Sequence, residues 1–260
     1  MKKFVALLLA VLMVASLCAC GQKDTGSDLQ TVTKGKLIMS TNAEFAPYEY
    51  VADDGKGFQG TGYEGIDIEI AYALAQKLGL ELVVDNMDFD AALSAVQTGK
   101  SDMVAAGVTV TPDRLNAMSF TDSYANGVQV VIVKEGSDIK SIDDLQGKKI
   151  GTQRGTTGFL YCSDDFGDDN VIGFDDGATA VQNLKAGKID CVVIDNVPAQ
   201  EYVKANPGLT ILDTEYANED YAIGIAKDNT ALQEALNKAL AELKADGTIQ
   251  SIIDKYISAK

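Results

Sequence analysis

The chain has 260 residues, of which 46% are hydrophobic and 23% are charged, and it carries a formal net charge of −16 at pH 7. This composition is typical of a globular protein of one or two domains, and its acidity argues against nucleic acid or an anionic membrane surface as a partner, because both require a cationic face. The chain contains no histidine, which removes the commonest general base and transition-metal ligand and makes an enzyme the less favoured class.

The first twenty residues are predicted to be a targeting segment. Lys2 and Lys3 precede an apolar run over residues 4–17, which is shorter than the roughly 20 residues that a membrane-spanning helix needs. We therefore expect a secretory signal peptide at residues 1–19. Its end and Cys20 read Leu-Cys-Ala-Cys, which resembles the lipobox of bacterial lipoproteins. That resemblance implies that Cys20 becomes an N-terminus acylated with fatty acids such as palmitate, so that lipid alone anchors the protein to the membrane, outside the cytoplasm.

The mature chain begins with a polar segment, residues 20–35, which is predicted to be a flexible tether. Beyond it, the spacing of apolar residues predicts alternating strands and helices. The predicted strands are residues 36–40, 80–84 and 103–106, and the helices are residues 66–78, a helix capped by Asp90 that ends at Gln97, and a helix that begins at Pro112 with Thr111 as its N-cap.

A second, similar series follows. Strands are predicted over residues 128–133, 149–152, 171–174, 191–194, 209–212 and 221–226. Helices are predicted to open within residues 155–158, over residues 177–186, after a cap at Asn196, and over residues 230–245 and 248–257. The alternation predicts an α/β fold.

Cys162 and Cys191 are the two cysteines that remain for the folded part once the signal is removed and Cys20 is lipidated. Outside the cytoplasm, two cysteines can form a disulfide. They can equally remain two buried free thiols, and the sequence leaves both states open.

The two series share an internal repeat. Residues 92–102 match residues 180–190 at a constant offset of 88, with the shared ending Gly-Lys-x-Asp. The same offset relates Gly107 to Asp195, each at the carboxyl end of the strand that follows. Because ligands bind outside the carboxyl ends of parallel strands, two lobes built alike would bring Gly107 and Asp195 to face each other across a cleft.

The chemistry of the two series is complementary. Arg114 lies at a helix start, where unpaired backbone N–H groups and a guanidinium fork suit a carboxylate, although an ordinary surface arginine would have the same sequence. Asp195 suits a cation, although a helix-capping or surface acid is the alternative. Together the two residues predict a site for a ligand that carries a carboxylate and an ammonium close together, which is an α-amino acid.

Several short motifs, in order over residues 36–260, resemble those of the bacterial solute-binding proteins of the amino-acid ABC transporters. They are Phe45-x-Pro47-Tyr48, residues 65–71, Phe89-Asp90-x-x-Leu93, residues 109–114 and Phe120-Thr121-Asp122-x-Tyr124. The resemblance implies an α/β, two-lobe periplasmic-binding-protein-like fold of type II, in which each lobe is a central sheet flanked by helices and the ligand cleft lies between the lobes.

The resemblance also implies the division of the chain between the lobes. Lobe 1 would contain residues 36–126 and 222–260, and lobe 2 would contain residues 127–221. Two crossover strands, near residues 125–128 and 217–222, would join them.

Nine residues have an implied role in binding an amino acid. Arg114, with Thr109 and Thr157, would hold the α-carboxylate, Asp195 and the Gly107 carbonyl would hold the α-ammonium, Phe45 and Phe89 would sandwich the side chain, and Asn42 and Gln153 would set selectivity. Plain core packing is the alternative for the two phenylalanines. Because binders of basic amino acids often carry an acid at the position of Asn42, a cationic side chain is disfavoured but not excluded, since Glu44 could substitute for that acid. Asn42, Glu44 and Gln153 together favour a polar side chain.

The leading interpretation is a monomeric extracytoplasmic lipoprotein that captures a polar L-amino acid by lobe closure and delivers it to an ABC permease and its ATPase. It would not be an enzyme and would need neither a cofactor nor a metal, since residues 155–158 lack phosphate-loop spacing and the acidic residues 164–170 lack EF-hand spacing. The alternatives are a ligand-sensing receptor subunit and, less favoured, an enzyme on the same fold that resembles cyclohexadienyl dehydratase.

Overall fold

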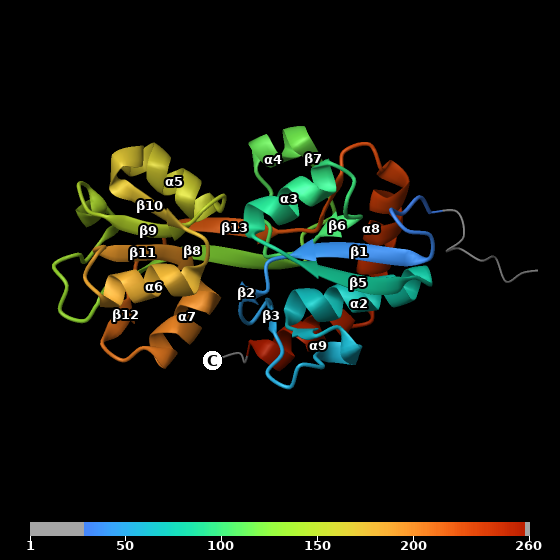
Figure 1. Ribbon diagram of the computed structural model, residues 1–260, viewed down its shortest axis with the longest axis horizontal. Helices are drawn as coiled ribbons and strands as arrows, with labels where there is room; N and C mark the ends of the chain where they lie inside the picture. Colours follow the sequence, from blue (N-terminus) through green and yellow to red (C-terminus); the bar gives the residue numbers. More distant parts are fainter. Residues whose placement is uncertain (1–28, 258–260) are drawn as a thin grey trace, which may run out of the picture.

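The computed structural model describes residues 29–257, so the predicted signal peptide, the lipidation of Cys20 and most of the predicted tether lie outside the described residues. Figure 1 shows two lobes lying side by side, each a sheet covered by helices. The α/β prediction is therefore confirmed. None of the helices in residues 29–257 combines the length and the apolar character that crossing a bilayer requires.

Lobe 1, as we use the term here, is built on a five-stranded sheet of order β5-β1-β6-β14-β7. Its strands are β1 (Lys36–Thr41), β5 (Glu81–Asn86), β6 (Met103–Val104), β7 (Met118–Phe120) and β14 (Gly224–Ala226). A small sheet beside it contains β2 (Glu44–Phe45), β3 (Glu49–Val51) and β4 (Tyr63–Glu64). The helices of this lobe are α2 (Ile66–Leu78), α3 (Phe89–Gln97), α4 (Pro112–Ala117), α8 (Thr230–Ala245) and α9 (Thr248–Tyr256).

Lobe 2 is built on a sheet of order β10-β9-β11-β8-β12, with β13 paired to one end of β8. Its strands are β8 (Ala125–Lys134), β9 (Ile150–Gln153), β10 (Val171–Phe174), β11 (Cys191–Asp195), β12 (Leu209–Ile211) and β13 (Ala217–Tyr221). Its helices are α5 (Thr157–Phe166), α6 (Gly177–Lys185) and α7 (Asn196–Ala205).

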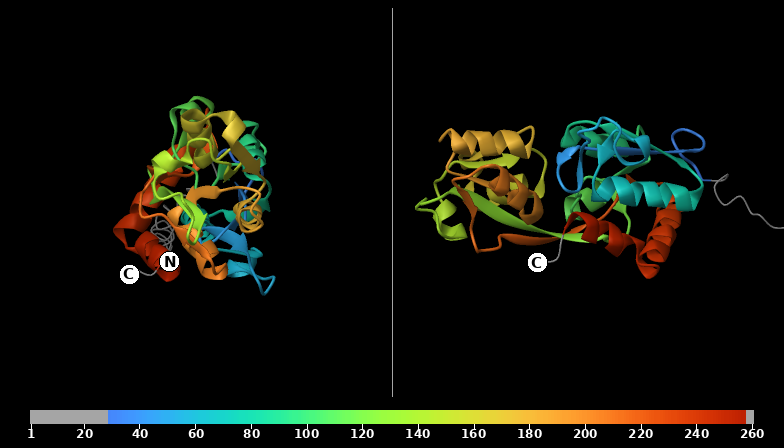
Figure 2. Two further views of the ribbon diagram at one scale, coloured as in Figure 1. Left: turned by 90° about the vertical axis from the view of Figure 1, so that its left-hand side faces the viewer. Right: turned by 90° about the horizontal axis from the view of Figure 1, so that it is seen from below.

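Two antiparallel strands connect the lobes. The first half of β8 pairs with β13, from Ala125 opposite Tyr221 to Gln129 opposite Ala217. The second half of β8 pairs with β11 and β12 inside lobe 2. Figure 2 shows β8 running from one lobe into the other. The predicted strand at residues 221–226 is therefore two strands, β13 and β14, because the chain leaves one sheet and joins the other between them.

Helix α2 forms where the apolar spacing and the C-terminal glycine predict a helix. The predicted helix over residues 66–78 is confirmed, and Gly79 ends it in the left-handed conformation at a φ of 69°. Ile66, Ile70 and Leu74 recur at helical spacing and are fully buried in the core of lobe 1, together with leucines of α8. The helix thus buries a stripe that its periodicity predicts.

The internal repeat of the sequence corresponds to a repeat of helices and strands in the structure. Helices α3 and α6 begin and end at positions 88 residues apart, and β6 and β11 begin at the same offset. The shared aspartate explains the motif: Asp102 accepts hydrogen bonds from the backbone N–H groups of Val32 and Ile38, both at 2.7 Å. At the matching position Asp190 accepts from Lys149 N at 2.8 Å. In both lobes the aspartate directly precedes a strand, β6 or β11. Its carboxylate accepts from the backbone at the beginning of the neighbouring strand, at Ile38 in β1 or at Lys149 just before β9.

Two predicted helix caps differ from the observed ones, one by two residues and the other by one. The N-cap of α3 is Asp88 rather than Asp90, and the N-cap of α7 is Asp195 rather than Asn196. Asp195 does not cap with its side chain, because that carboxylate has other partners in the functional site. Residues 30–32, which the sequence places in a flexible tether, are held to lobe 1 by Asp102 and by Asn229, whose side chain donates to Gln30 O at 2.9 Å.

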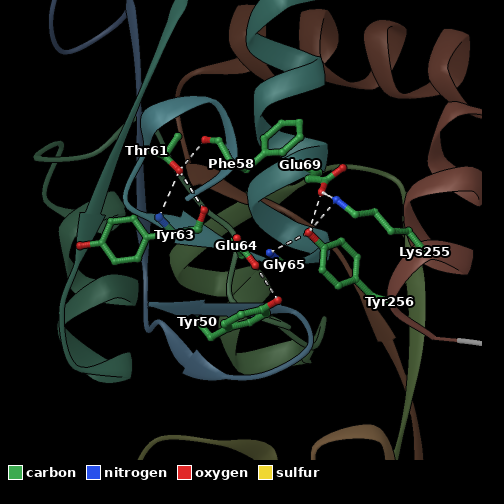
Figure 3. A network of polar contacts seen from close by, with 9 residues as sticks. All are labelled: Tyr50, Phe58, Thr61, Tyr63, Glu64, Gly65, Glu69, Lys255 and Tyr256. Atoms are coloured by element: carbon green, nitrogen blue, oxygen red, sulfur yellow. Dashed lines mark hydrogen bonds and ion pairs between the residues drawn. The ribbon is translucent and has the colours of Figure 1, made fainter. Parts of the chain in front are cut away.

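The C-terminal helix α9 is fixed to the start of α2 by the polar network in Figure 3. The Tyr256 hydroxyl donates to Glu69 Oε1 at 2.6 Å and accepts from Gly65 N at 3.3 Å, and Lys255 pairs with the same carboxylate. This contact fixes the small sheet to the body of lobe 1 at the end of β4, which directly precedes Gly65.

Cys162 and Cys191 are buried free thiols, not a disulfide. Both lie in one apolar cluster of lobe 2, Cys162 on α5 and Cys191 at the start of β11. Of the two states that the sequence left open, the structure therefore has the reduced one.

We expect the Asp102→Ala variant to be destabilised by about 1–3 kcal/mol, because two strong backbone hydrogen bonds lose their charged acceptor. Urea unfolding followed by circular dichroism measures the change. Asp190→Ala is the matched control, since Asp190 is exposed and its carboxylate accepts from only one backbone N–H, that of Lys149. Equal losses in the two variants would contradict this account.

We also expect both thiols to resist alkylation in the folded protein. Burial raises the pKa of Cys162 to about 12 and also raises the pKa of Cys191, so neither forms the reactive thiolate at neutral pH. Iodoacetamide labelling before and after denaturation, read by peptide mass spectrometry, should modify both only after denaturation. Recovery of a peptide pair that links Cys162 to Cys191 would contradict the reduced state.

Candidate functional site

A pocket between the two lobes is lined by all nine residues that the sequence placed in a binding site. They are Asn42, Phe45, Phe89, Gly107, Thr109, Arg114, Gln153, Thr157 and Asp195. Six further residues line it: Glu49, Ala106, Gln129, Thr156, Val193 and Ile194. The sequence therefore identified the location of the pocket, while the role of each residue there is a separate question.

The ends of parallel strands explain why these residues meet. Asn42 follows β1, and Gly107 stands three residues beyond β6, which runs parallel to β1 in lobe 1. Gln153 and Asp195 are the last residues of β9 and β11, which run parallel in lobe 2. Each lobe thus turns the carboxyl ends of its strands toward the other, where open α/β sheets bind ligands.

Arg114 is held in place by both lobes. Its backbone N–H donates to the Thr111 side chain at the predicted N-cap of α4. The residue is 8% exposed, and its guanidinium donates to Thr109 O at 2.8 Å and, across the cleft, to Gly155 O at 3.0 Å. The guanidinium also lies 5.4 Å from the centre of the Phe89 ring. Burial lowers the pKa of Arg114, but arginine stays charged in proteins, so a positive charge faces the pocket.

Asp195 supplies the opposite charge from lobe 2. Its carboxylate accepts from Gln129 Nε2 at 2.9 Å and from the Tyr221 hydroxyl. Gln129 stands directly opposite Asp195 in the sheet, and its Nε2 also donates to Glu219 Oε2 at 2.8 Å. Burial, followed by the nearby Glu219 carboxylate, raises the pKa of Asp195. Neutral donors thus hold this carboxylate, and no cation from the described residues is hydrogen-bonded to it.

Gly107 permits a close approach that another residue would prevent. Its φ is +54°, and a Cβ at this position would lie 2.8 Å from Phe45 Cε1. Its N–H donates to Asp67 Oδ2 at 2.9 Å, and the Tyr124 hydroxyl donates to the same oxygen at 2.7 Å. The aspartate at the start of α2 therefore orients the backbone of the pocket wall.

Asn42 and Gln153 line the pocket and join the two lobes. Gln153 Nε2 donates to Asn42 Oδ1 at 2.9 Å and to Asp175 O at 3.1 Å, and Asn42 Nδ2 donates to Met87 O at 3.0 Å. Acids surround this bridge. Burial, followed by repulsion from Asp176, Asp88 and Asp175, raises the pKa of Glu44.

Sequence reasoning missed two buried polar residues of the pocket, Glu49 and Gln129, each 1% exposed. Gln129 had a readable signal, because it is the one polar residue in the predicted strand over residues 128–133. Glu49 had none, since a glutamate between two tyrosines in a short strand is ordinarily exposed.

Buried acids outnumber buried cations around the pocket. Glu49, Asp67, Asp195 and Glu219 are all buried, whereas Arg114 is the one buried cation among the described residues. An excess of carboxyl groups in a poorly solvated site favours a ligand that brings positive charge.

Comparisons with known proteins agree with this geometry. Residues 37–259 match the model of the bacterial extracellular solute-binding proteins, family 3. The chain is 33% identical to the arginine-binding extracellular protein ArtP of Bacillus subtilis (strain 168), over 100% of both chains. It is 34% identical to ABC transporter arginine-binding protein 1 of Escherichia coli (strain K12), over 85% of this chain and 90% of the relative. The structure of an ancestral arginine-binding protein bound to arginine matches with a TM-score of 0.79 and 41% identity, over 86% of this chain and 99% of that one.

We expect Gly127→Ala to disturb the site from within the connecting strand β8. A Cβ at residue 127 would lie 2.3 Å from the Tyr221 hydroxyl oxygen and 2.7 Å from Asp195 Oδ1, and both side chains are buried. The overpacking should cost about 1–3 kcal/mol of stability, measured by urea unfolding. Asn126→Ala is the matched control, because it removes only an exposed hydrogen bond to Asp220 between the same strands. A stable Gly127→Ala variant would contradict the packing described.

Proposed function

Since this chain belongs to the bacterial extracellular solute-binding proteins of family 3, we propose that its inter-lobe pocket captures an L-amino acid whose side chain carries a positive charge. The observation that carries the proposal is that a guanidinium and a carboxylate from opposite lobes line one pocket with a surplus of buried acids. An α-amino acid presents the two complementary charges one carbon apart. A cationic side chain would offset the surplus.

The α-carboxylate is proposed to bind Arg114. The guanidinium has its own carbonyl partners at two nitrogens, which hold the fork in place for a second interaction. Thr109 and Thr157 line the same part of the pocket, and Thr157 is the first residue of α5, where helix N–H groups lack partners within the helix.

The α-ammonium is proposed to bind Asp195, assisted by the Gly107 carbonyl. The carboxylate of Asp195 has neutral hydrogen-bond donors and needs a cation to complete its surroundings. Bound there, the ammonium would also offset the repulsion between Asp195 and Glu219.

The ligand's side chain is proposed to lie between Phe45 and Phe89 and to end near Asn42 and Gln153. Aromatic walls suit the apolar stem of a long cationic side chain and attract its charge. The acids around Glu44 supply the negative potential that Asn42 itself does not. The names of the relatives, which describe arginine-binding proteins, support a cationic side chain, which Asn42 disfavoured in the sequence.

Binding is proposed to close the lobes over the ligand. We assign residues 36–126 and 222–260 to one moving unit and residues 127–221 to the other, connected by β8 and β13. Contacts from both lobes would be complete only in the closed state, so the ligand would shift the population toward it. The hydrogen bonds of Arg114 to Gly155 and of Asn42 to Gln153 support a closed arrangement that these side chains can reach.

Delivery to an ABC importer is the cellular role that we propose, with the chain held at the outer face of the membrane by lipid on Cys20. One relative is named as part of an ABC transporter, which supports the permease and ATPase as partners. Binding rather than catalysis is supported by the same names, which describe binding proteins.

Thermal unfolding of the mature protein tests the proposed function. We expect L-arginine, L-lysine or L-ornithine to raise the melting temperature most among the standard amino acids, ornithine and cystine. Arg114→Ala should lose about 2–5 kcal/mol of binding free energy by calorimetry, because it leaves the ligand carboxylate without its charged partner. The absence of any amino-acid-dependent shift, or unchanged affinity in Arg114→Ala, would refute the proposal.

A further inference from the structure

Glu49 is a pocket-lining acid without an assigned role. It lies on β3 in the small sheet, it is 1% exposed, and its Oε2 has no conventional hydrogen-bond donor among the described residues. The buried carboxyl group of Asp67 lies beside it, and Asp67 Oδ1 likewise has no hydrogen-bond donor among the described residues. Two carboxyl groups that lie side by side away from water strongly disfavour ionisation of both, so one of them is expected to hold a proton beside the pocket.

The partners of the two acids indicate which of them holds the proton. Asp67 accepts hydrogen bonds from Gly107 N and from the Tyr124 hydroxyl, and both favour the ionised form. Glu49 has no comparable donor. Burial, followed by the charge of Asp67, raises the pKa of Glu49. Because Asp67 has two donors that favour its carboxylate and Glu49 has none, we expect Glu49 to be the member of the pair that holds the proton.

The charged and titratable groups that face Glu49 come from four elements. They are Asp67 on α2, Tyr124 before β8, Asp195 at the end of β11 and Tyr48 beside Glu49 itself. All are acids or phenols, and the one cation that lines the pocket, Arg114, is held by Thr109 and Gly155. A cation that entered the pocket would therefore be the group that favours an ionised Glu49.

We propose that Glu49 is a further ligand-binding residue, which accepts a hydrogen bond from a cationic group of the bound amino acid and releases its proton when the ligand enters. This inference rests on the proposed function, because it requires a cationic ligand. It assigns a second carboxylate, beside Asp195, to the recognition of positive charge in this pocket.

The proton balance is simple. The neutral carboxyl group of Glu49 gives its proton to water or buffer, and the carboxylate that remains accepts an N–H of the ligand. Ligand binding thus favours the deprotonated form, so affinity must rise as pH rises through the range between the pKa of Glu49 in the complex and its pKa in the free protein. Lower pH would weaken binding by the same linkage.

Isothermal titration calorimetry with L-arginine, at one pH in phosphate and in Tris, measures the released proton directly. The two buffers differ in their heat of protonation, so a difference in the observed enthalpy reports protons released on binding. We expect the unaltered protein to release protons, and Glu49→Gln to release fewer. We also expect Glu49→Gln to bind about 10- to 100-fold more weakly, the loss typical of one charge-assisted hydrogen bond.

The Glu49→Gln variant should fold, because the amide nitrogen can donate to Asp67 in place of the carboxyl proton. Glu64→Gln is the matched control: it makes the same chemical change in β4 of the same small sheet, where Glu64 contacts Tyr50 outside the pocket (Figure 3). The control should bind and release protons as the unaltered protein does.

The outcomes separate this inference from the proposed function. If the unaltered protein does not bind L-arginine, the proposed cationic ligand is wrong and the inference fails with it. If it binds L-arginine without releasing protons, or if Glu49→Gln keeps the affinity and the proton release of the unaltered protein, the role of Glu49 is refuted while the proposed function stands.

Discussion

The structure depends on keeping a buried guanidinium and a buried carboxylate in one pocket without joining them. Arg114 is stabilised by the carbonyl oxygens of Thr109 and Gly155, and Asp195 by the neutral donors of Gln129 and Tyr221. Neither group therefore uses the other as its hydrogen-bond partner. A buried ion that is held by neutral dipoles keeps the capacity to attract an opposite charge, and two such ions of opposite sign form a site for a zwitterion.

The connecting strands give this arrangement its geometry. Gln129 on β8 stands opposite Asp195 on β11 and opposite Ala217 on β13, so its side chain lies on the face that Asp195 and Glu219 share. The loop that carries Thr109 also pairs with Tyr221 on β13. The residues proposed to bind the ligand therefore contact the two strands, β8 and β13, about which the lobes would move. Ligand binding in the pocket would then be coupled directly to closure of the lobes.

The surplus of acid is what makes the pocket selective in our account. Gln129 is a neutral donor, so it hydrogen-bonds to the carboxylates of Asp195 and Glu219 without cancelling their negative charge. The unpaired negative charge that remains disfavours an empty, closed pocket and favours a ligand that carries a cation. The proposed role of Glu49 agrees with this selectivity. Its proton reduces the negative charge of the empty pocket, and the cationic ligand takes the place of that proton.

The sequence by itself determined much of this protein. Helices α2 and α8 begin and end where periodicity and caps predicted, because their buried stripes are local patterns that tertiary packing did not override. The 88-residue repeat located Asp195 opposite Gly107, since repeated α/β units place equivalent strand ends at equivalent positions. The cap of Thr111 similarly fixed where α4 begins and where Arg114 stands.

Only the tertiary structure decided the rest. Glu49 is buried because the small sheet packs over the cleft, and its partner Asp67 comes from another element, so no local pattern marks it. The bridge from Gln129 to Asp195 and Glu219 joins residues 66 and 90 positions apart. The free thiols depend on packing in the same way. Whether an acid is ionised and whether a thiol is oxidised depend on the groups that surround them in the folded protein. The sequence reveals those neighbours only where a repeat, a helix or a strand determines which residues come together.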